Sequence, residues 1–341
     1  MTLNPETIAQ LINGVTPEFT GVVSVHEGEN AIFAQGYGYA NRAERLPNTP
    51  ETRFGVASGS KIFTAIAILQ LVEQGRLGFD SRLLELVKAD FPHFDPGITV
   101  HHLLTHTSGA PDYFDEEFMD DFEAMWKEVP VYTLHGPRDL LPLFQHQPMK
   151  FAPGMRFSYN NGGYVLLGLI IEAVTGQRYV DYVTENVLVP AGMVNTGYFP
   201  MHALPEHTAY GYIEGENGSW VTNIFAVPAF GQPDGGAFTT AADMARFWDA
   251  LRQHRLLVPE MVARMLTLQA TEDDSNGYGY GVWLKHQAGV VNAFYVVGED
   301  PGVSFLSRVY PATNRLLTIL GNTDSAAWPV AKALEPYLTS G

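Results

Sequence analysis

Near the start of the chain, apolar and polar positions alternate in a way that predicts a β-hairpin. Two segments rich in β-branched and aromatic residues lie within the run GVVSVHEGENAIFAQGYGYAN, which begins at Gly21. Between them stands the short polar stretch from Glu27 to Asn30, which contains a glycine. Because such a stretch suits a tight reversal of the chain, the sequence predicts two antiparallel strands here.

A second pattern, in KIFTAIAILQLVEQG, spreads apolar residues over most of a helical circumference before Gly75. A helix that is apolar on most of its sides belongs inside the molecule, and glycine suits the position just past a helix end. We therefore expect a buried helix that ends at Gly75. From about Ser81 to Val221, further helical patterns are interrupted by proline, glycine and polar loops.

The last third of the chain changes from a helical to a β-rich pattern. After the glycine-rich turn GQPDGGAF, the segment TTAADMARFWDALR predicts a helix with Thr239 or Thr240 as its N-cap. A turn is expected at 311–314 and a final helix over about 326–338. Strands are expected at Tyr278 to Leu284, Val290 to Val297, Val303 to Tyr310 and Leu316 to Leu320.

This order of elements predicts an α+β fold. Strands at both ends of the chain enclose a helical middle, so we expect the N- and C-terminal strands to share one antiparallel sheet flanked by helices. The predicted sheet domain comprises residues 1–80 and 222–341, and the inserted, mainly helical domain comprises residues 81–221.

Composition narrows the class of protein. Apolar residues make up 46% and charged residues 17% of the 341 residues, a balance typical of a compact globular protein. Acidic residues outnumber basic ones by 37 to 20, and the formal net charge of −17 disfavours nucleic acid and anionic lipid surfaces as partners. The absence of cysteine removes disulfides, thiolate nucleophiles and cysteine metal sites.

The N-terminal segment, MTLNPETIAQLINGV, lacks the basic start and the continuous apolar stretch of a secretory signal. No later run reaches the length of a membrane-spanning helix. We therefore expect a soluble, cytoplasmic protein without a membrane partner. A leader removed from the chain is the alternative that this pattern leaves open.

The first candidate chemistry is the run from Ser58 to Lys61, at the start of the expected buried helix. If Ser58 opens that helix, residues three apart share one face, and its hydroxyl can meet the Lys61 amine. Serine becomes a good nucleophile when a neighbouring base takes its proton, and a lysine can serve when desolvation lowers its pKa. The structural alternative is an N-cap serine followed by a first-turn lysine.

A second candidate pair, Tyr159 and Asn161, precedes another apolar helix in FSYNNGGYVLLGLIIEAVTG. A phenol and a carboxamide two residues apart on a loop can both point into one cleft. Tyr159 acts as a phenolate base if a charged Lys61 lies beside it, whereas Asn161 can donate to a substrate carbonyl and hold Lys61. Ordinary turn or cap residues are the alternative for this pair.

Several ordered segments together closely resemble the serine β-lactamase and penicillin-recognising enzyme superfamily, from about Gly21 to Asn322. These segments are RFGVASGSKIFTAIAILQLVEQGRLGFD, ITVHHLLTHTSGAPDY, FSYNNGGYVLLGLIIEAVTG and GQPDGGAFTTAADMARF. The resemblance looks nearest to the branch of class C β-lactamases, D-alanyl-D-alanine carboxypeptidases, D-amino acid amidases and β-lactamase-like carboxylesterases. It implies a β-lactamase/transpeptidase-like fold with the active site in the cleft between the two domains. It also implies that Ser58 is the acylated nucleophile, Lys61 the activating lysine, and Tyr159 with Asn161 the second motif.

The third motif of that superfamily is where the sequence departs from the resemblance. Lys-Thr-Gly or His-x-Gly is usual there, whereas the corresponding positions, counted back from PGVSF, are Val296-Val297-Gly298. The missing cation ordinarily helps to hold a substrate carboxylate, so Val296 argues against anionic substrates. Gly298 still lets substrate lie close to the strand. The N–H of Glu299 can pair with that of Ser58 as an oxyanion hole.

Four further features have weaker functional interpretations. Lys285 and His286 are better explained by surface solvation than as a replacement for the missing cation. His102 and His106 have zinc-ligand spacing, but no glutamate stands between them, and a structural role is favoured. The acidic stretch 112–121 is either a lid over the cleft or a solvated face. Glu299 and the aspartate after it either repel anionic substrates or form a turn.

These observations predict a serine hydrolase that forms a covalent acyl-enzyme on an ester or small amide, without metal or organic cofactor. Ser58, Lys61 and Tyr159 are the predicted catalytic residues, and Asn161, Gly298 and Glu299 the predicted substrate-binding ones. The predicted partner is a small molecule: an ester, an amide or a short peptide. The alternatives are a D-alanyl-D-alanine carboxypeptidase or β-lactamase, and a catalytically silent binding protein of the same fold.

Overall fold

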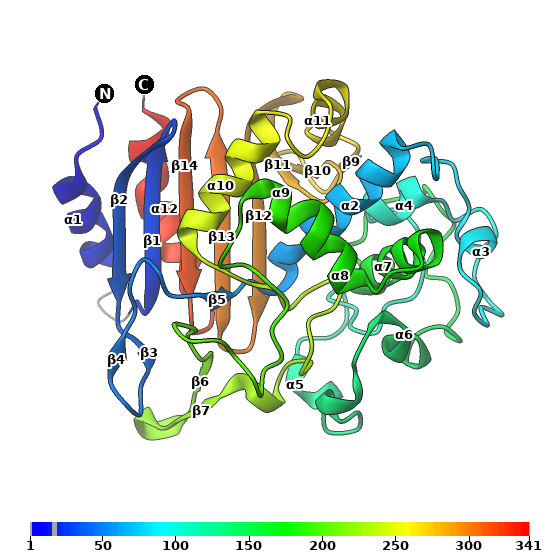
Figure 1. The fold of residues 1–341 in the computed structure, drawn as a ribbon, viewed down its shortest axis with the longest axis horizontal. Helices are drawn as coiled ribbons and strands as arrows, with labels where there is room; N and C mark the ends of the chain where they lie inside the picture. Colours follow the sequence, from blue (N-terminus) through cyan, green and yellow to red (C-terminus); the bar gives the residue numbers. More distant parts are fainter. Residues whose placement is uncertain (1, 16–18, 341) are drawn as a thin grey trace.

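The computed structural model describes residues 2–15 and 19–340 and is built around one antiparallel sheet (Figure 1). In spatial order its strands are β2 (Asn30–Tyr37), β1 (Gly21–Glu27), β14 (Arg315–Gly321), β13 (Val303–Tyr310), β12 (Val290–Asp300), β11 (Trp283–Gln287), β10 (Asn276–Tyr278) and β9 (Ala270–Thr271). The first strand of the chain therefore pairs with the last, with Val23 opposite Ile319. This confirms the prediction that strands from both ends share one sheet.

Short strand pairs lie outside this sheet. They are β3 (Tyr39–Asn41) with β4 (Leu46–Pro47), β5 (Phe54–Gly55) with β8 (Phe238–Thr239), and β6 (Tyr212–Glu214) with β7 (Trp220–Thr222). The strand predicted from Tyr278 to Leu284 is wrong, because the chain turns between β10 and β11. In that turn Gly281 has φ +73° and its backbone lies against Ala65, so residues 279–282 cannot continue a strand.

Helices cover both faces of the sheet and form a separate layer beside it (Figure 1). The longer ones are α1 (Pro5–Val15), α2 (Lys61–Glu73), α7 (Asn161–Thr175), α10 (Ala241–Arg252), α11 (Pro259–Met265) and α12 (Ala327–Thr339). The shorter ones are α3 (Leu83–Leu86), α4 (Val100–Leu104), α5 (Phe122–Met125), α6 (Pro137–Leu140), α8 (Tyr179–Val183) and α9 (Val189–Ala191). The helices expected near residues 61, 240 and 326 are all present.

The cap of α10 follows from its sequence. Thr240, one of the two predicted N-caps, accepts a hydrogen bond from Asp243 N at 3.2 Å. That bond satisfies one of the amides that a helix start leaves without an intrahelical partner. Helices α1 and α12 pack together on one face of the sheet, whereas α10 packs on the other.

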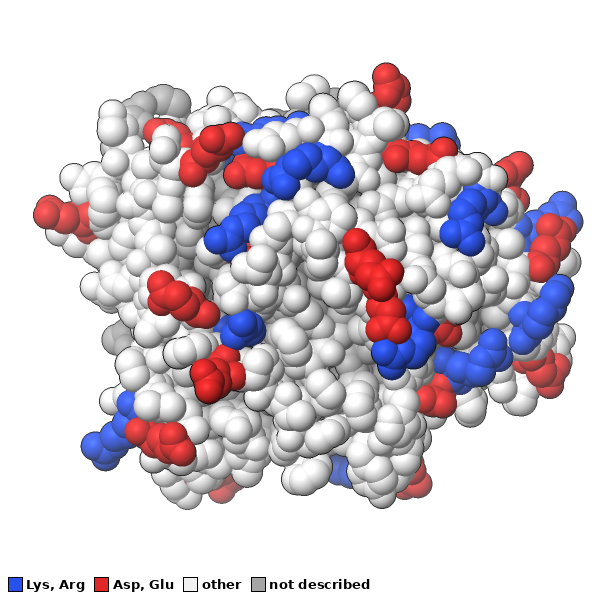
Figure 2. Space-filling model, viewed as in Figure 1, with Lys and Arg blue, Asp and Glu red and all other residues white. Residues whose placement is uncertain are grey.

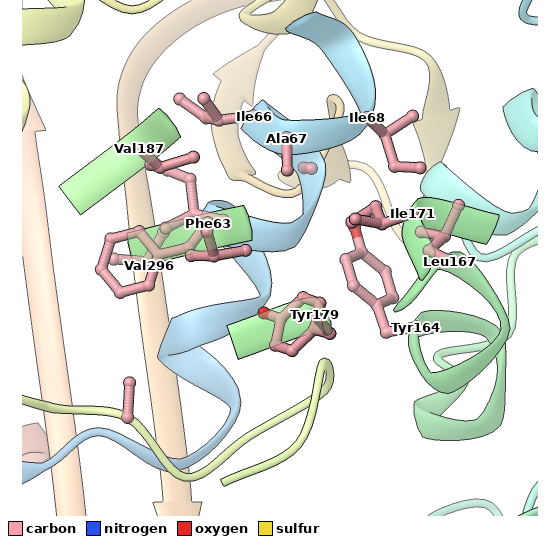
Figure 3. Close-up of a cluster of buried hydrophobic side chains, with 14 of the residues drawn as sticks. Phe63, Ile66, Ala67, Ile68, Tyr164, Leu167, Ile171, Tyr179, Val187 and Val296 are labelled. Atoms are coloured by element: carbon pink, nitrogen blue, oxygen red, sulfur yellow. The ribbon is translucent and has the colours of Figure 1, made fainter. Parts of the chain in front are cut away.

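Helix α2 is the centre of the larger core (Figure 3). Its apolar residues point in nearly all directions and are almost all fully buried, as expected for a helix without a polar face. Side chains of α7 and α8 contact it on one side, and Val296 of β12 lies near Phe63 on the other. Helix α2 therefore holds the sheet and the helical layer together. The domain limits at residues 80 and 222 stay a prediction.

The surface carries charges of both signs. On the face drawn in Figure 2, Lys and Arg side chains are interspersed with Asp and Glu and form no continuous basic area. Among the described helices, none is both long and apolar enough to cross a membrane.

Candidate active site

Ser58 is presented on a tight turn at the end of β5. The turn is the 3₁₀ helix η1 (Ala57–Ser60), in which Gly59 N donates to Val56 O at 2.8 Å. Ala57 has φ 44°, a left-handed conformation that costs an alanine energy and turns the chain sharply. The predicted position of Ser58 as the first residue of α2 is therefore wrong by one turn. The spacing of three residues still brings it to Lys61.

Lys61 Nζ makes three polar contacts although only 2% of the residue is exposed. It lies 2.8 Å from Ser58 Oγ, 2.8 Å from Asn161 Oδ1 and 2.7 Å from the carbonyl oxygen of Asp234. The amide and carbonyl oxygens can only accept, so they take two N–H groups of the amine. The third direction of the amine points at Ser58 Oγ. A neutral Lys61 can accept the hydroxyl proton of Ser58, whereas a charged Lys61 can donate a hydrogen bond to the hydroxyl oxygen.

Tyr159 lies above this pair. Lys61 Nζ is 5.0 Å from the centre of its ring, and the ring stacks on Trp283 with centroids 5.9 Å apart. Burial raises the pKa of Tyr159 well above its ordinary value, and the Glu116 carboxylate adds to the increase, whereas the Ser58 hydroxyl opposes it. The phenol is therefore neutral at neutral pH, which suits donating a proton better than serving as a standing phenolate.

His106 holds the loop that carries Tyr159. Its Nδ1 accepts a hydrogen bond from Asn160 N at 3.0 Å, and its ring centre lies 4.4 Å from that of Tyr159. Burial lowers the pKa of His106 well below its ordinary value, so the ring stays neutral and can accept. His102 instead caps α4 together with Thr99. Among the described residues, no group of three or more His, Asp or Glu side chains is placed to hold a metal ion.

The acidic stretch 112–121 is tied to the protein. Asp112 is 5% exposed and accepts hydrogen bonds from Asn161 N at 2.6 Å and Gly162 N at 2.8 Å, which caps α7. Asp115 lies 2.6 Å from Lys150, and Glu117 lies 2.6 Å from Arg156. Residues 116–121 are exposed, as a solvated face requires, while the ion pairs and the contacts of Asp112 hold the stretch beside Asn161. The lid and the solvated face both stay predictions.

Sequence reasoning missed the role of Asp234. Its glycine-rich neighbourhood was expected to form a turn, which it does, with Gln232 N donating to Gly235 O at 2.8 Å. That turn brings the carbonyl oxygen of Asp234 to Lys61, while Tyr113 OH donates to the carboxylate. The signal that could have pointed to Asp234 was the resemblance, which covers this segment. The contact itself joins residues 173 positions apart, so it leaves no local pattern in the sequence.

The segment Val296-Val297-Gly298 of β12 lies beside the turn that carries Ser58. A Cβ added to Gly298 would stand 2.8 Å from Ser58 N and 2.1 Å from Val56 O, so β12 runs directly against the turn that carries the serine. The N–H of Glu299 follows at once along the strand. Val296 is 3% exposed and belongs to the core.

Neither Lys285 nor His286 replaces the missing cation. Lys285 lies 2.7 Å from Glu335 of α12, away from the residues around Ser58. The neighbouring His286 is 8% exposed, so the expectation of surface solvation is wrong for it. Lys285 and His286 have different surroundings because successive side chains of a strand point to opposite faces of the sheet.

A cavity of about 980 Å³ contains Ser58, Tyr159, Asn161, Gly298 and Glu299 among its lining residues. Lys61 lies behind Ser58, outside the cavity wall. The structure thus brings all six predicted site residues together at one cavity or directly behind it. This arrangement has the parts needed for acyl transfer: a hydroxyl, an amine that can take its proton, a phenol and backbone amides.

Comparison with known proteins agrees with this geometry. "Penicillin-binding protein 4*" of Bacillus subtilis is 29% identical over 329 residues, which cover 91% of this chain and 70% of that protein. The crystal structure of a penicillin-binding protein from Bacillus halodurans superposes with a TM-score of 0.93 at 48% identity and covers 97% of this chain and 99% of that one.

A D-stereospecific amidohydrolase from Streptomyces sp. has a TM-score of 0.78 at 25% identity, over 97% of this chain and 98% of that one. The family model described as Beta-lactamase matches residues 14–336, nearly the whole chain. The chain therefore belongs to the Beta-lactamase family, whose members share this fold of a large antiparallel sheet flanked by helices.

Proposed function

We propose that this protein is a serine hydrolase that works through a covalent acyl-enzyme, with Ser58 as the nucleophile. The observation that carries the proposal is the 2.8 Å contact between Ser58 Oγ and Lys61 Nζ. The amine is buried, and its other two contacts are to oxygen acceptors. This geometry leaves Ser58 as the one partner whose proton the amine can take.

In the proposed reaction, Lys61 accepts the proton of Ser58 while the serine oxygen bonds to the substrate carbonyl carbon. The N–H groups of Ser58 and Glu299 stabilise the oxyanion that develops. The bond to the leaving group then breaks, and the leaving group takes a proton from the neutral phenol of Tyr159, which Lys61 replaces. A water molecule hydrolyses the acyl-enzyme by the same steps in reverse order.

An ester or small amide is the substrate class that the cavity supports. No lysine, arginine or histidine is among the described residues that line it. A carboxylate-bearing substrate such as a penicillin or a peptide with a C-terminal D-alanine would therefore lack a cationic anchor there. The similarity to a D-stereospecific amidohydrolase favours an amide over a β-lactam.

Mass spectrometry after incubation with a fluorophosphonate tests the proposal. The wild type should gain one covalent adduct, located on Ser58, and the Ser58→Ala variant should gain none. Folded wild-type protein without an adduct would contradict the hydrolase proposal and support the catalytically silent binding protein.

The substrate class is tested separately, by measuring turnover of a short-chain nitrophenyl ester and a chromogenic cephalosporin side by side. The ester should be hydrolysed with the higher kcat/KM. Faster turnover of the cephalosporin would favour the β-lactamase alternative.

A further inference from the structure

A second cavity lies between helix α12 and one end of the sheet. Its volume is about 480 Å³, a size typical of sites for small molecules. Residues of β10 to β13 form one wall, and α12 forms the other. Among the described lining residues, Trp328 alone also lines the active-site cavity. This second cavity, called the α12 cavity below, is therefore separate from the site around Ser58.

The sheet wall of the α12 cavity belongs to a row of side chains that crosses three strands. Trp283 of β11 stands opposite Tyr295 of β12, and Tyr295 stands opposite Arg308 of β13. Residues directly opposite on neighbouring strands point to the same face of a sheet. The guanidinium carbon of Arg308 lies 4.8 Å from the centre of the Tyr295 ring. Lys285, two residues beyond Trp283 on β11, shares this face.

The helix wall is one face of α12, which packs on the same side of the sheet (Figure 1). Residues three or four positions apart share a helix face, and the lining residues Trp328, Ala331, Lys332 and Glu335 have this spacing. Trp328 is 39% exposed, so part of its ring is accessible. The α12 cavity thus combines apolar surface with charged groups.

The described lining of the α12 cavity has more cations than anions, although the chain as a whole has a formal net charge of −17. The cations are Lys285, Arg308 and Lys332, and the carboxylate is Glu335. Glu335 Oε1 lies 2.7 Å from Lys285 Nζ and 3.4 Å from Arg308 Nη1. Lys332 has no ion-pair partner among the described residues. One carboxylate is therefore shared by two cations, which leaves charge for a second anion.

Arg308 is the group in this lining that most needs an acceptor. The residue is 6% exposed, and in the described part of the chain its side chain makes a single long hydrogen bond, the 3.4 Å contact with Glu335. Its Nε is buried without a partner, as is the hydroxyl of the nearby Tyr310. A guanidinium has five N–H donors, and burying donors without acceptors costs free energy. An oxyanion beside Arg308 would supply these acceptors.

Two carboxylates outside this lining, Glu272 and Asp273, are close enough for their charges to act on Tyr295. Asp273 is already used within its own loop, where its Oδ1 accepts hydrogen bonds from Ser275 N at 2.6 Å and Asn276 N at 2.8 Å. Glu272 lines the active-site cavity. Neither carboxylate is recorded in a hydrogen bond or ion pair with Arg308.

We propose that the α12 cavity binds a small aromatic carboxylate. Its carboxylate group contacts Arg308, with Lys285 and Lys332 adding positive charge, and its ring lies against Trp328. A planar guanidinium matches a carboxylate with two parallel hydrogen bonds, and an indole ring offers a flat apolar surface. This site lies outside the active-site cavity and goes beyond the proposed hydrolase function.

Isothermal titration of the wild type with benzoate and benzamide tests the charge requirement. The two probes have nearly the same shape and differ in charge. Benzoate should bind about tenfold or more tightly than benzamide, the effect of a charge-assisted contact. Equal affinities would overturn the proposal. Inorganic phosphate tests the aromatic part, because phosphate binding as tight as that of benzoate would overturn the aromatic class.

Two variants with opposite expected effects test the residues. Arg308→Gln should weaken benzoate binding by about tenfold, because the principal donor is lost. Glu335→Gln should strengthen it by about threefold or more, because a competing carboxylate is removed. A structural role alone would weaken binding in both variants, and that result would overturn the proposal. Because Arg308 is buried, the double variant Lys285→Gln/Lys332→Gln repeats the test at more accessible residues, and unchanged affinity there would contradict it.

Two controls establish where benzoate binds. Lys88→Gln makes the same charge change as the lysine variants at an exposed residue outside both cavity linings, and it should bind benzoate like the wild type. Ser58→Ala should also keep wild-type affinity. Altered benzoate affinity in Ser58→Ala would place the probe in the active-site cavity and overturn the proposal, whatever the outcome of fluorophosphonate labelling.

Discussion

Gly298 of β12 lies against the backbone of Ser58 so closely that a methyl group at position 298 would stand 2.8 Å from Ser58 N. It would also stand 2.1 Å from Val56 O and 2.6 Å from Gly59 N. All three are backbone atoms of the turn that presents the serine, so they cannot move aside as a flexible side chain would. The absence of a side chain at residue 298 therefore sets the distance between the strand and the nucleophile.

The Gly298→Ala variant should consequently displace the turn and lower the rate of fluorophosphonate labelling of Ser58 by about 10²-fold, since small misplacements of reacting groups have effects of this size. Gly14→Ala is the control, because among the described residues no atom outside its own helix backbone and chain neighbours lies within 4 Å of a Cβ at that position. It should label at the wild-type rate. Normal labelling of Gly298→Ala would show that the turn and strand can separate without loss.

The Tyr159→Phe variant should keep the ring stacked on Trp283 and lose only the hydroxyl. Because the phenol is neutral and proposed to protonate the leaving group, we expect kcat for an amide substrate to fall by about 10²-fold or more. Stopped-flow or steady-state assays measure this, with the exposed Tyr132→Phe as a control expected to match the wild type. A change below about threefold would assign the proton transfers to Lys61 alone.

Position 106 requires two properties of its residue: an acceptor for the hydrogen bond from Asn160 N, and a left-handed backbone with φ 56°. Two replacements of His106 test these requirements. Asparagine tolerates that conformation and offers a side-chain acceptor, whereas valine meets neither demand. His106→Val should lower the free energy of unfolding by about 1–3 kcal/mol more than His106→Asn does. Urea unfolding of both variants measures the difference, and equal loss in both would indicate that ring packing alone matters.

Asp300→Asn should change how stability depends on pH. The carboxyl has an ordinary pKa of 3.8 when unfolded, and burial raises its pKa to about 7 in the folded protein. Between these values the folded protein binds a proton that the unfolded chain has released, so this group lowers wild-type stability as the pH rises. Asparagine does not titrate.

The stability of Asp300→Asn relative to wild type should therefore increase from about pH 4 to about pH 7 and stay level above. Thermal unfolding of the variant and the wild type at a series of pH values measures this difference. Parallel curves for Asp300→Asn and wild type would show that the folded protein does not raise the pKa of this carboxyl.

Local sequence patterns predicted much of the secondary structure and the chemistry of the site. The helix around Ile66, the cap at Thr240 and the spacing of Ser58 and Lys61 all follow from interactions within about four residues along the chain. The one strand predicted wrongly, from Tyr278 to Leu284, failed because its glycines turn the chain against α2, and that contact is remote in sequence.

The sequence by itself determined which groups could do the chemistry: a serine with a lysine three residues later, then a tyrosine and an asparagine before an apolar helix. Only the tertiary structure decided that the carbonyl of Asp234 holds Lys61, and that His106 holds the loop of Tyr159. The physical reason is distance along the chain. Patterns record local propensity, whereas these contacts arise when the sheet and helical layers pack around α2 and bring remote loops into one cavity.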